Sequence, residues 1–269
     1  MRKRLIPCIF LKNGLIIRSE GFKIHQMIGN PITELARYNE WAVDEIIYID
    51  ISKEQNYDFG RDDHKYRDEN IVDRYSLVKE IAKSCFVPLS FGGGIRTIED
   101  IRNILANGAD KVVLNTALFL DDNFLQEAAQ IFGSQALIAC VDYIGDDVYF
   151  ESATKKSPYK VLDWCKKLEK LGIGEIVLNS VERDGKACGY DIKTVENVVK
   201  NINLPVIALG GVGDYYDFVE IFQAANPSAA AAGNIFHFKE LSYYHAKQDL
   251  LRNNIDIRQE FRALKQNNL

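Results

Sequence analysis

The chain has 269 residues, 47% of them hydrophobic, and a formal net charge of −5 at pH 7. That length and hydrophobic content suffice for a large core, and no Pro/Gly/Ser-rich linker interrupts the chain, so we expect a single domain over residues 1–269. Basic and acidic side chains are interspersed, which leaves no basic face for a nucleic-acid partner.

Composition also limits the compartment and the ligands. The apolar run after the N-terminal basic residues is interrupted by Pro7, Lys12 and Asn13, and no apolar stretch reaches the roughly twenty residues that span a membrane. We therefore expect a cytoplasmic protein without a membrane partner. The five cysteines lack a C-x-x-C pair and the four histidines lack metal-ligand spacing, so reduced thiols, no metal and no cofactor are expected.

Short apolar runs alternate with amphipathic stretches along the chain, which predicts strands alternating with helices. The predicted strands cover residues 5–9, 45–51, 87–91, 111–114, 136–142, 175–179, 205–209 and 228–232. The predicted helices cover a segment opened by Pro31, then residues 71–84, 98–107, 123–132, 160–171, 192–200, 214–225 and 237–252. We also expect a loop over residues 10–30, a charged segment over 52–70 that is either a lid or a solvated excursion, and a small hairpin at 146–152.

Eight such strand and helix pairs predict a parallel sheet closed as a (β/α)₈ TIM barrel. An internal repeat favours the barrel over an open sheet. Gly93 and Gly210 lie 117 residues apart, and so do Phe119 and Phe236, within stretches that both alternate strand, glycine turn, helix and strand. We therefore predict a barrel built from two similar half-barrels.

The glycine turns after the third and the seventh predicted strand are candidate anion sites. Gly93 and Gly94 follow one strand, and Gly210 and Gly211 follow the other. Ligands of such barrels bind where the strands end, and the backbone N–H groups of a glycine turn bind phosphate without a basic side chain. Two such turns predict a substrate with two separated phosphates; a purely structural duplication is the alternative.

Three aspartates close predicted strands or follow them. Asp142 ends a buried strand, where apolar walls would raise a carboxyl pKa toward neutrality, so we predict that it acts as an acid or base; a loop cap is the alternative. Asp184, in the turn ERDG, either works with Asp142 or accepts N–H bonds from its own turn. Asp50 is either a third site carboxylate or a cap.

Four charged residues mark the opposite mouth of the predicted barrel. Arg4, Glu45, Lys111 and Glu175 each lie at the start of a predicted strand, so their side chains should meet at the N-terminal mouth. This cluster is either a stabilising ring of ion pairs or a gate to a passage along the barrel axis.

Six stretches of the chain together resemble one protein family. They are RLIPC, DEIIYIDIS, FGGGIRTIEDIRNILANGADKVVLNT, FGSQALIACVD, GEIVLNSVERDGKACGYD and LPVIALGGVG. Through them the chain resembles, over nearly its whole length, the cyclase subunit of imidazole glycerol phosphate synthase. The resemblance implies a (β/α)₈ barrel that receives ammonia from a glutaminase subunit at its N-terminal face. At the other end such a barrel makes an imidazole product and an aminoimidazole carboxamide ribotide.

The resemblance also implies roles for individual residues. It implies phosphate sites at Gly94, Asn115 and Thr116 in one half, and at Asp184, Gly185, Gly211, Gly233 and Asn234 in the other. It places Arg4, Glu45, Lys111 and Glu175 at the ammonia entrance, and Asp110 beside the glutaminase.

One position departs from the family in a way that bears on the reaction. The family uses two aspartates as acid and base, and Asp142 matches the second, but Phe10 stands at the first and cannot transfer a proton. Asn234 also stands where a serine is usual. The run PCIFLKN is similar to a paralogous branch associated with acetamidino modification of bacterial surface sugars, in which the barrel pairs with a glutaminase and serves a separate sugar amidotransferase.

The sequence therefore predicts a lyase-type or synthase-type subunit of a glutamine amidotransferase complex. It would channel or use ammonia to form an acetamidino group on a nucleotide-linked sugar, for surface polysaccharide such as lipopolysaccharide. The histidine-pathway cyclase is one alternative, and a non-catalytic conduit that activates a glutaminase is another.

Overall fold

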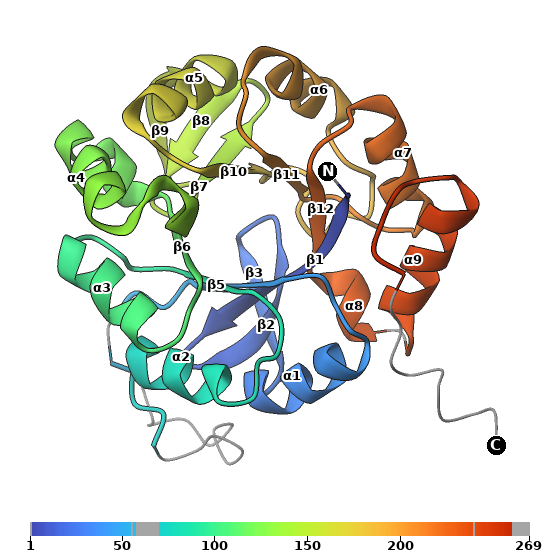
Figure 1. Cartoon of the computed structure of the whole chain (residues 1–269), viewed down its shortest axis with the longest axis horizontal. Coiled ribbons are helices and arrows are strands. Elements are labelled where there is room, and N and C mark those ends of the chain that lie inside the picture. The colour runs from blue at the N-terminus through green and yellow to red at the C-terminus, as the bar shows by residue number, and fades with distance from the viewer. Residues whose placement is uncertain (1, 55, 58–69, 239, 260–269) are drawn as a thin grey trace.

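Eight parallel strands close into a barrel in the computed structural model, which describes residues 2–54, 56–57, 70–238 and 240–259. The barrel strands are β1 (Arg4–Lys12), β4 (Ile46–Asp50), β5 (Leu89–Gly92), β6 (Lys111–Leu114), β7 (Leu137–Ile144), β10 (Glu175–Ser180), β11 (Val206–Leu209) and β12 (Ala229–Ala232). Parallel pairing of β12 with β1, and of β7 with β10, completes the ring. The predicted (β/α)₈ TIM barrel is confirmed (Figure 1).

Helices surround the barrel on its outside (Figure 1). They are α1 (Pro31–Glu40), α2 (Arg74–Ala82), α3 (Ile98–Ala106), α4 (Asp122–Phe132), α5 (Val161–Leu171), α6 (Ile192–Asn201), α7 (Tyr216–Ala224) and α9 (Ser242–Arg252). Local sequence explains several of their starts. Asp73 and Thr97 each form a capping box ahead of α2 and α3, and the Asn30 side chain caps α1, where Pro31 is the first residue.

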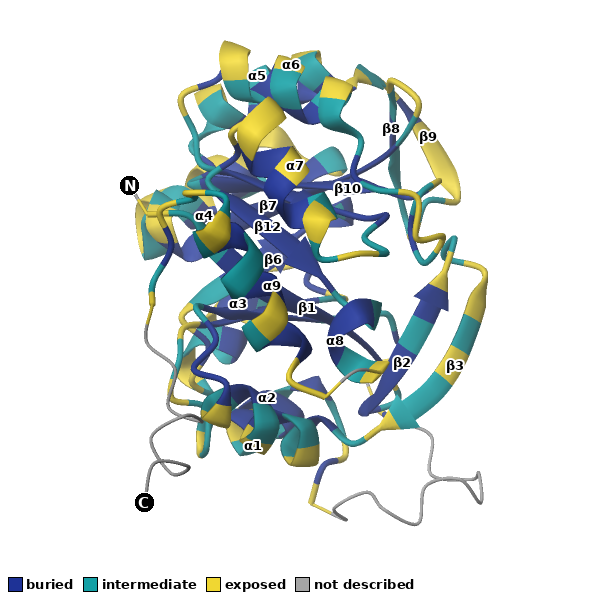
Figure 2. Ribbon diagram, turned by 90° about the vertical axis from the view of Figure 1, so that its right-hand side faces the viewer, coloured by how far each residue is buried: buried dark blue, intermediate teal, exposed yellow. Residues whose placement is uncertain are grey.

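The core has two parts, one between the barrel and its helices and one inside the barrel. Figure 2 shows the barrel strands as the most deeply buried part of the molecule. The inner part is almost entirely apolar and consists of Ile6, Cys8, Ile47, Val113, Ile138, Cys140, Val177, Ile207, Leu209, Ala229 and Ala231. All five cysteines are free, and burial raises the pKa of Cys140, which keeps its thiol neutral.

The loop predicted over residues 10–30 is wrong. The first barrel strand continues to Lys12, and β2 (Leu15–Glu20) turns back against it and pairs with β3 (Ile24–Gly29). Asn13 and Gly14 form the turn with positive φ angles of 50° and 73°. An Asn-Gly pair between apolar residues is a strong hairpin signal, because both positions tolerate this backbone conformation. The hairpin β2–β3 therefore stands over one side of the barrel end.

Two further predictions need correction. The hairpin expected at 146–152 is part of a three-stranded extension in which β7 continues into β8 (Asp147–Phe150) and then β9 (Lys155–Lys160). The helix expected over 237–252 is two helices, α8 (Asn234–Phe238) and α9. Leu241 precedes α9 in the left-handed region, with φ of 55°, so one continuous helix is impossible there.

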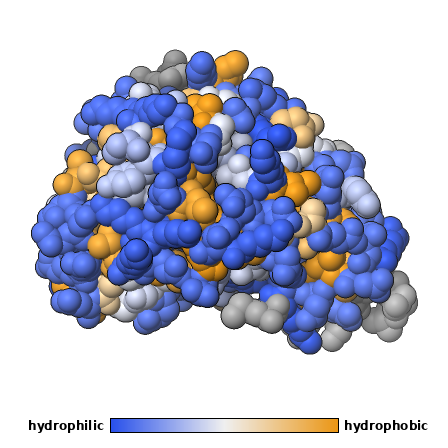
Figure 3. All heavy atoms as spheres, turned by 90° about the horizontal axis from the view of Figure 1, so that it is seen from above, coloured by the Kyte–Doolittle hydropathy of each residue, from blue (hydrophilic) through white to orange (hydrophobic). Residues whose placement is uncertain are grey.

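Most of the charged segment 52–70 lies outside the described residues. The structure therefore does not decide whether this segment is a lid or a solvated excursion. In the part of the chain that the structure describes, no helix is long and apolar enough to cross a membrane. No three His, Cys, Asp or Glu side chains among those residues gather as a metal site. The face in Figure 3 is mostly hydrophilic, with hydrophobic residues in small, scattered patches.

Candidate functional site

Two cavities open at the carboxyl ends of the barrel strands, and each is lined by residues from both halves of the chain. The first cavity has a volume of about 460 Å³, and its lining includes Gly93, Gly94, Asn115, Thr116, Asp142 and Asn179. The second cavity has a volume of about 290 Å³, and its lining includes Arg18, Asp184, Gly185, Gly210, Gly211, Gly233 and Asn234. Phe10 lines both cavities. The structure thus brings the predicted phosphate residues together in two groups.

The triple-glycine turn of the first cavity fits closely against its neighbours. A Cβ at Gly93, where φ is 110°, would overlap the carbonyl oxygen of Asp50, and a Cβ at Gly94 would overlap the Arg74 guanidinium. Arg74 is buried, and its Nη1 donates a 2.8 Å hydrogen bond to the Gly93 carbonyl oxygen. Only glycine lets the backbone pass this close to the end of β4 and to Arg74.

Asp142 is held at the floor of the first cavity by two amide side chains. Asn115 Nδ2 donates to its Oδ2 at 3.0 Å, and Asn179 Nδ2 donates to its Oδ1 at 2.7 Å. The carboxylate is 5% exposed, and burial raises its pKa to about 6, with a further contribution from the charge of Asp184. A carboxylate of this kind exchanges a proton near neutral pH.

The other residues predicted for the first phosphate are mostly occupied by protein contacts. Asn115 Nδ2 also donates to the Cys140 carbonyl oxygen at 3.0 Å, and Thr116 Oγ1 accepts from the Glu151 backbone N–H at 3.2 Å. Thr116 begins the 3₁₀ helix η2 (Thr116–Phe119). The backbone of the glycine turn is therefore the better candidate for an anion in this half.

Asp50 serves as a cap at the end of β4. Its carboxylate accepts from the backbone N–H of Ser52 at 2.9 Å and from its hydroxyl, and also from the Tyr57 hydroxyl at 2.9 Å. These bonds use both carboxylate oxygens, although Asp50 also lines the first cavity.

In the second cavity, Asp184 anchors the hairpin β2–β3. Ser19 Oγ donates to its Oδ2 at 2.7 Å, and the Gly21 backbone N–H donates to its carbonyl oxygen at 3.0 Å. Burial raises the pKa of Asp184 as well, against the hydrogen bonds from Ser19 and the Phe22 backbone, which lower it. The structure therefore does not pair Asp184 with Asp142 by a hydrogen bond.

The backbone around the second cavity has the features of a phosphate site. Gly210 and Gly211 have φ angles of 100° and 102°, and a Cβ at Gly211 would overlap the Gly189 carbonyl oxygen. The short helix α8 begins at Asn234 immediately after Gly233. Loops after the seventh and eighth strands, with a short extra helix, form a common phosphate site in this fold. The Asn234 side chain itself donates to the Ser19 carbonyl oxygen at 3.1 Å.

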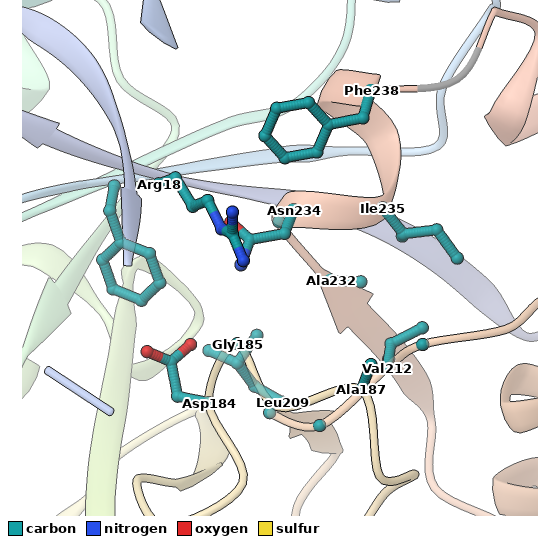
Figure 4. Close-up of a pocket in the computed structure, with 15 residues that line it drawn as sticks. Arg18, Asp184, Gly185, Ala187, Leu209, Val212, Ala232, Asn234, Ile235 and Phe238 are labelled. Atoms are coloured by element: carbon teal, nitrogen blue, oxygen red, sulfur yellow. The ribbon is translucent and has the colours of Figure 1, made fainter. Parts of the chain in front are cut away.

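Arg18 is a candidate functional residue that the sequence predictions missed. It lies on β2, and its side chain projects into the second cavity beside Asn234, with Phe238 near it and Asp184 across the space (Figure 4). Its side chain is 40% exposed, and its guanidinium carbon lies 5.8 Å from the centroid of the Phe238 ring. The turn signal at Asn13-Gly14 would have predicted this strand at the end of the barrel, with Arg18 as a candidate ligand-binding residue.

Phe10 lies where the family resemblance calls for the first aspartate. It is 7% exposed, and its ring packs edge-on against Phe22 of the hairpin turn, with the centroids 5.7 Å apart. Because it lines both cavities, an apolar ring stands between the two candidate phosphate sites, and it can transfer no proton.

At the opposite mouth, the four predicted charged residues form one cluster. Arg4 forms ion pairs with Glu45, at 2.7 Å, and with Glu175, and Lys111 Nζ lies 2.8 Å from Glu175 Oε2. Their side chains are between 6% and 24% exposed. Asp110 lies on the same face, where its carboxylate accepts from the Leu89 backbone N–H at 2.8 Å. The arrangement fits a stabilising ring and a gate equally well.

Comparison with known proteins assigns the family. A family model described as "Histidine biosynthesis protein" matches residues 4–242. The chain belongs to this family. The imidazole glycerol phosphate synthase subunit HisF of Hydrogenobaculum sp. is 36% identical over 263 residues, which cover 96% of this chain and 99% of that protein.

Relatives that carry the name hisF2 have a comparable sequence identity to this chain. A putative imidazole glycerol phosphate synthase subunit hisF2 of Vibrio vulnificus is 40% identical and covers 96% of this chain and 92% of its own length. Another hisF2 protein, from Pseudomonas aeruginosa, is 37% identical and covers 88% of this chain and 92% of its own length.

Proposed function

We propose that this barrel partners a HisH-like glutaminase at its N-terminal face and supplies or uses ammonia to form an acetamidino group on a nucleotide-linked sugar, in the cytoplasm, for surface polysaccharide. The observation that carries the proposal is Phe10. It occupies the position of one acid–base aspartate of the cyclase and lines both cavities, so that of the two acid–base positions only the one at Asp142 holds a carboxylate. A cyclase reaction that needs two acid–base carboxylates therefore lacks one of them here.

The interior of the barrel supports passage of ammonia rather than ammonium. Between the charged cluster at one mouth and Asp142 at the other, the interior is lined by aliphatic side chains, alanines and two neutral thiols. A charged ammonium ion would lose its hydration there at a large cost, while neutral ammonia would lose little. The charged cluster at the entrance would then accept a proton from ammonium or control access to the interior. It consists of Arg4, Glu45, Lys111 and Glu175.

The two cavities support a phosphorylated substrate. The glycine turns and Arg18 offer backbone N–H groups and a guanidinium, both of which bind phosphate oxygens. In the overall conversion, ammonia replaces the carbonyl oxygen of an acetamido group, which leaves as water. A separate sugar amidotransferase would activate that oxygen, so this chain needs no cofactor of its own.

One observation favours the histidine-pathway cyclase as a second candidate. Asp142 and both glycine turns are present in the arrangement that the cyclase resemblance implies, with a carboxylate pKa of about 6. A conduit that only activates a glutaminase would need neither Asp142 nor the phosphate cavities.

Turnover assays separate these candidates. The purified barrel, with a glutaminase or with ammonium salts, is expected to leave the histidine-pathway ribonucleotide unchanged, while Phe10→Asp should gain measurable cyclase activity. With a sugar amidotransferase and a nucleotide-linked N-acetyl sugar, the wild-type protein should form the amidine. Normal cyclase turnover by the wild-type protein would overturn the proposal.

Two variants divide the barrel roles further. Asp142→Asn should abolish product formation if this barrel performs chemistry and should leave sugar modification intact if it is a conduit. Arg4→Ala combined with Lys111→Ala should reduce glutamine-dependent activity and spare ammonium-dependent activity. Unchanged glutamine-dependent activity would show that the cluster is a structural ring only.

A further inference from the structure

One buried acceptor in the first cavity has no hydrogen-bond donor within the part of the chain that the structure describes. Asn179 is 1% exposed and lines that cavity. Its Nδ2 donates to Asp142, but no donor among the described residues reaches its Oδ1. A buried amide oxygen without a donor costs about 1–3 kcal/mol of stability. Such a group at a cavity floor points to a ligand that donates a hydrogen bond.

Asn115 shows that holding Asp142 does not require an unused oxygen. It donates to the same carboxylate, yet its own Oδ1 accepts from the Thr116 hydroxyl at 3.4 Å. Both amides therefore donate a hydrogen bond to Asp142, but they differ in their oxygens. Asn115 Oδ1 accepts a hydrogen bond, whereas Asn179 Oδ1 accepts none from the described residues.

The position of Asn179 along β10 suggests which donor arrives. In the parallel pairing of β10 with β7, Asn179 lies beside Asp142, Val177 beside Cys140, and Glu175 beside Ile138. Glu175 belongs to the charged cluster at the N-terminal mouth, and Val177 belongs to the apolar interior. Along this strand, Asn179 is thus the first polar side chain that a molecule leaving the barrel interior would meet.

We propose that Asn179 Oδ1 and the Asp142 carboxylate together bind ammonia where it leaves the barrel interior. Each oxygen accepts one N–H, so two of the three hydrogens are held and the nitrogen lone pair stays free to face the cavity. The pair concentrates and orients the nucleophile without changing it. This inference rests on the proposed passage of ammonia through the barrel.

The test uses ammonium chloride as the probe and the Asp142 side-chain carbon as the reporter. The ¹³C signal of Asp142 is assigned by its loss in Asp142→Asn and is followed at pH 9 during titration with ammonium chloride, with sodium chloride at equal ionic strength as the blank. A saturable shift is expected in the wild-type protein and in the control Asn197→Leu, which makes the same substitution at an exposed position on α6. In Asn179→Leu, half-saturation should need about tenfold more ammonium, the factor that about 1.4 kcal/mol produces.

A second variant and a second probe complete the test. Asn179→Ala removes the same oxygen with less crowding and serves if the leucine variant does not fold, as judged by circular dichroism. Acetamide replaces ammonium in a parallel titration. Equal ammonium responses in wild-type and Asn179 variants, or a response of the pair to acetamide alone, would overturn the assignment to ammonia.

The same variants keep this inference apart from the proposed function. If amidine formation proceeds in Asn179→Leu with an unchanged KM for ammonium, the binding pair is wrong and the function stands. If ammonium binds through Asn179 but no sugar is modified, the function fails and the pair stands.

Discussion

The two cavities contain similar glycine turns, yet they use their aspartates in opposite ways. In the first cavity, two amides of the barrel hold Asp142 with its carboxylate toward the open space. In the second, the Asp184 carboxylate accepts a hydrogen bond from the Ser19 hydroxyl and so attaches the hairpin β2–β3 to the barrel. The turns are therefore similar, while contact with the hairpin β2–β3 gives Asp184 a structural role that Asp142 does not have.

Gly94 in the first turn and Gly211 in the second differ in what surrounds them. In the first, a side chain at Gly94 would meet the end of a flexible arginine, Arg74, whereas one at Gly211 in the second would meet the backbone of Gly189. Backbone cannot move aside as a side chain can, so Gly211 should tolerate a side chain less well than Gly94 does.

The largest expected effect tests this difference. Gly211→Ala should lower the free energy of unfolding by about 3 kcal/mol, because it adds backbone overlap to a φ of 102° that alanine avoids. Gly94→Ala, at a φ of 64°, should cost about 1–2 kcal/mol. Urea denaturation measures both, with Gly29→Ala as the control because nothing lies within 4 Å of its Cβ position. Equal losses would show that Gly94 and Gly211 are equally constrained.

A somewhat smaller effect concerns the pH dependence of stability. The pKa of Asp142 is about 6 in the folded protein, raised by burial above the 3.8 of a free carboxyl. The ionised form therefore opposes folding above pH 6, and the wild-type protein should gain stability as the pH falls through 6 toward 4. Asp142→Asn removes that penalty, so its free energy of unfolding at pH 8 should be about 2 kcal/mol higher than that of the wild-type protein.

Urea denaturation at a series of pH values measures this difference. The advantage of Asp142→Asn should shrink as the pH falls below 6 and vanish below about pH 3, where the wild-type carboxyl is mostly protonated in both states. Glu127→Gln removes an exposed carboxylate from α4 and should change stability little at either pH. A constant difference across the range would mean that the Asp142 carboxylate carries no burial penalty.

The smallest effect separates the cavities by ligand binding. Arg18→Gln should weaken binding of inorganic phosphate to the second cavity about tenfold, since a charge-assisted hydrogen bond contributes about 1.5 kcal/mol. Calorimetry at low and high salt should show the difference shrinking as salt screens the guanidinium. Lys23→Gln removes the same charge from an exposed place on the same hairpin. If both variants bind phosphate equally, Arg18 is no phosphate ligand.

Much of the scaffold was predictable because its signals are local. The barrel strands appear as short apolar runs, and Thr97 and Asp100 announce α3 through capping-box spacing. The hairpin of β1 with β2 was also within reach, since Asn13-Gly14 is its turn signal. Its role in closing the second cavity was not, because Ser19 and Asp184 lie 165 residues apart.

Asn179 illustrates the limit at the site itself. In the sequence it is one polar residue at the end of an apolar run, and nothing near it in the chain names a partner. Its bond to Asp142 depends on the register of β10 against β7, which places the two residues side by side. The unpaired oxygen follows from that register and from burial.

The sequence by itself determined the alternation of strands and helices, the paired glycine turns and the presence of an apolar ring at Phe10, because each of these depends on residue type and local spacing. The tertiary structure alone decided that Asp142 is held by Asn115 and Asn179 and that Asp184 is bound to the hairpin. These contacts join residues far apart in the chain, and only closure of the barrel sets the strand register that brings them together.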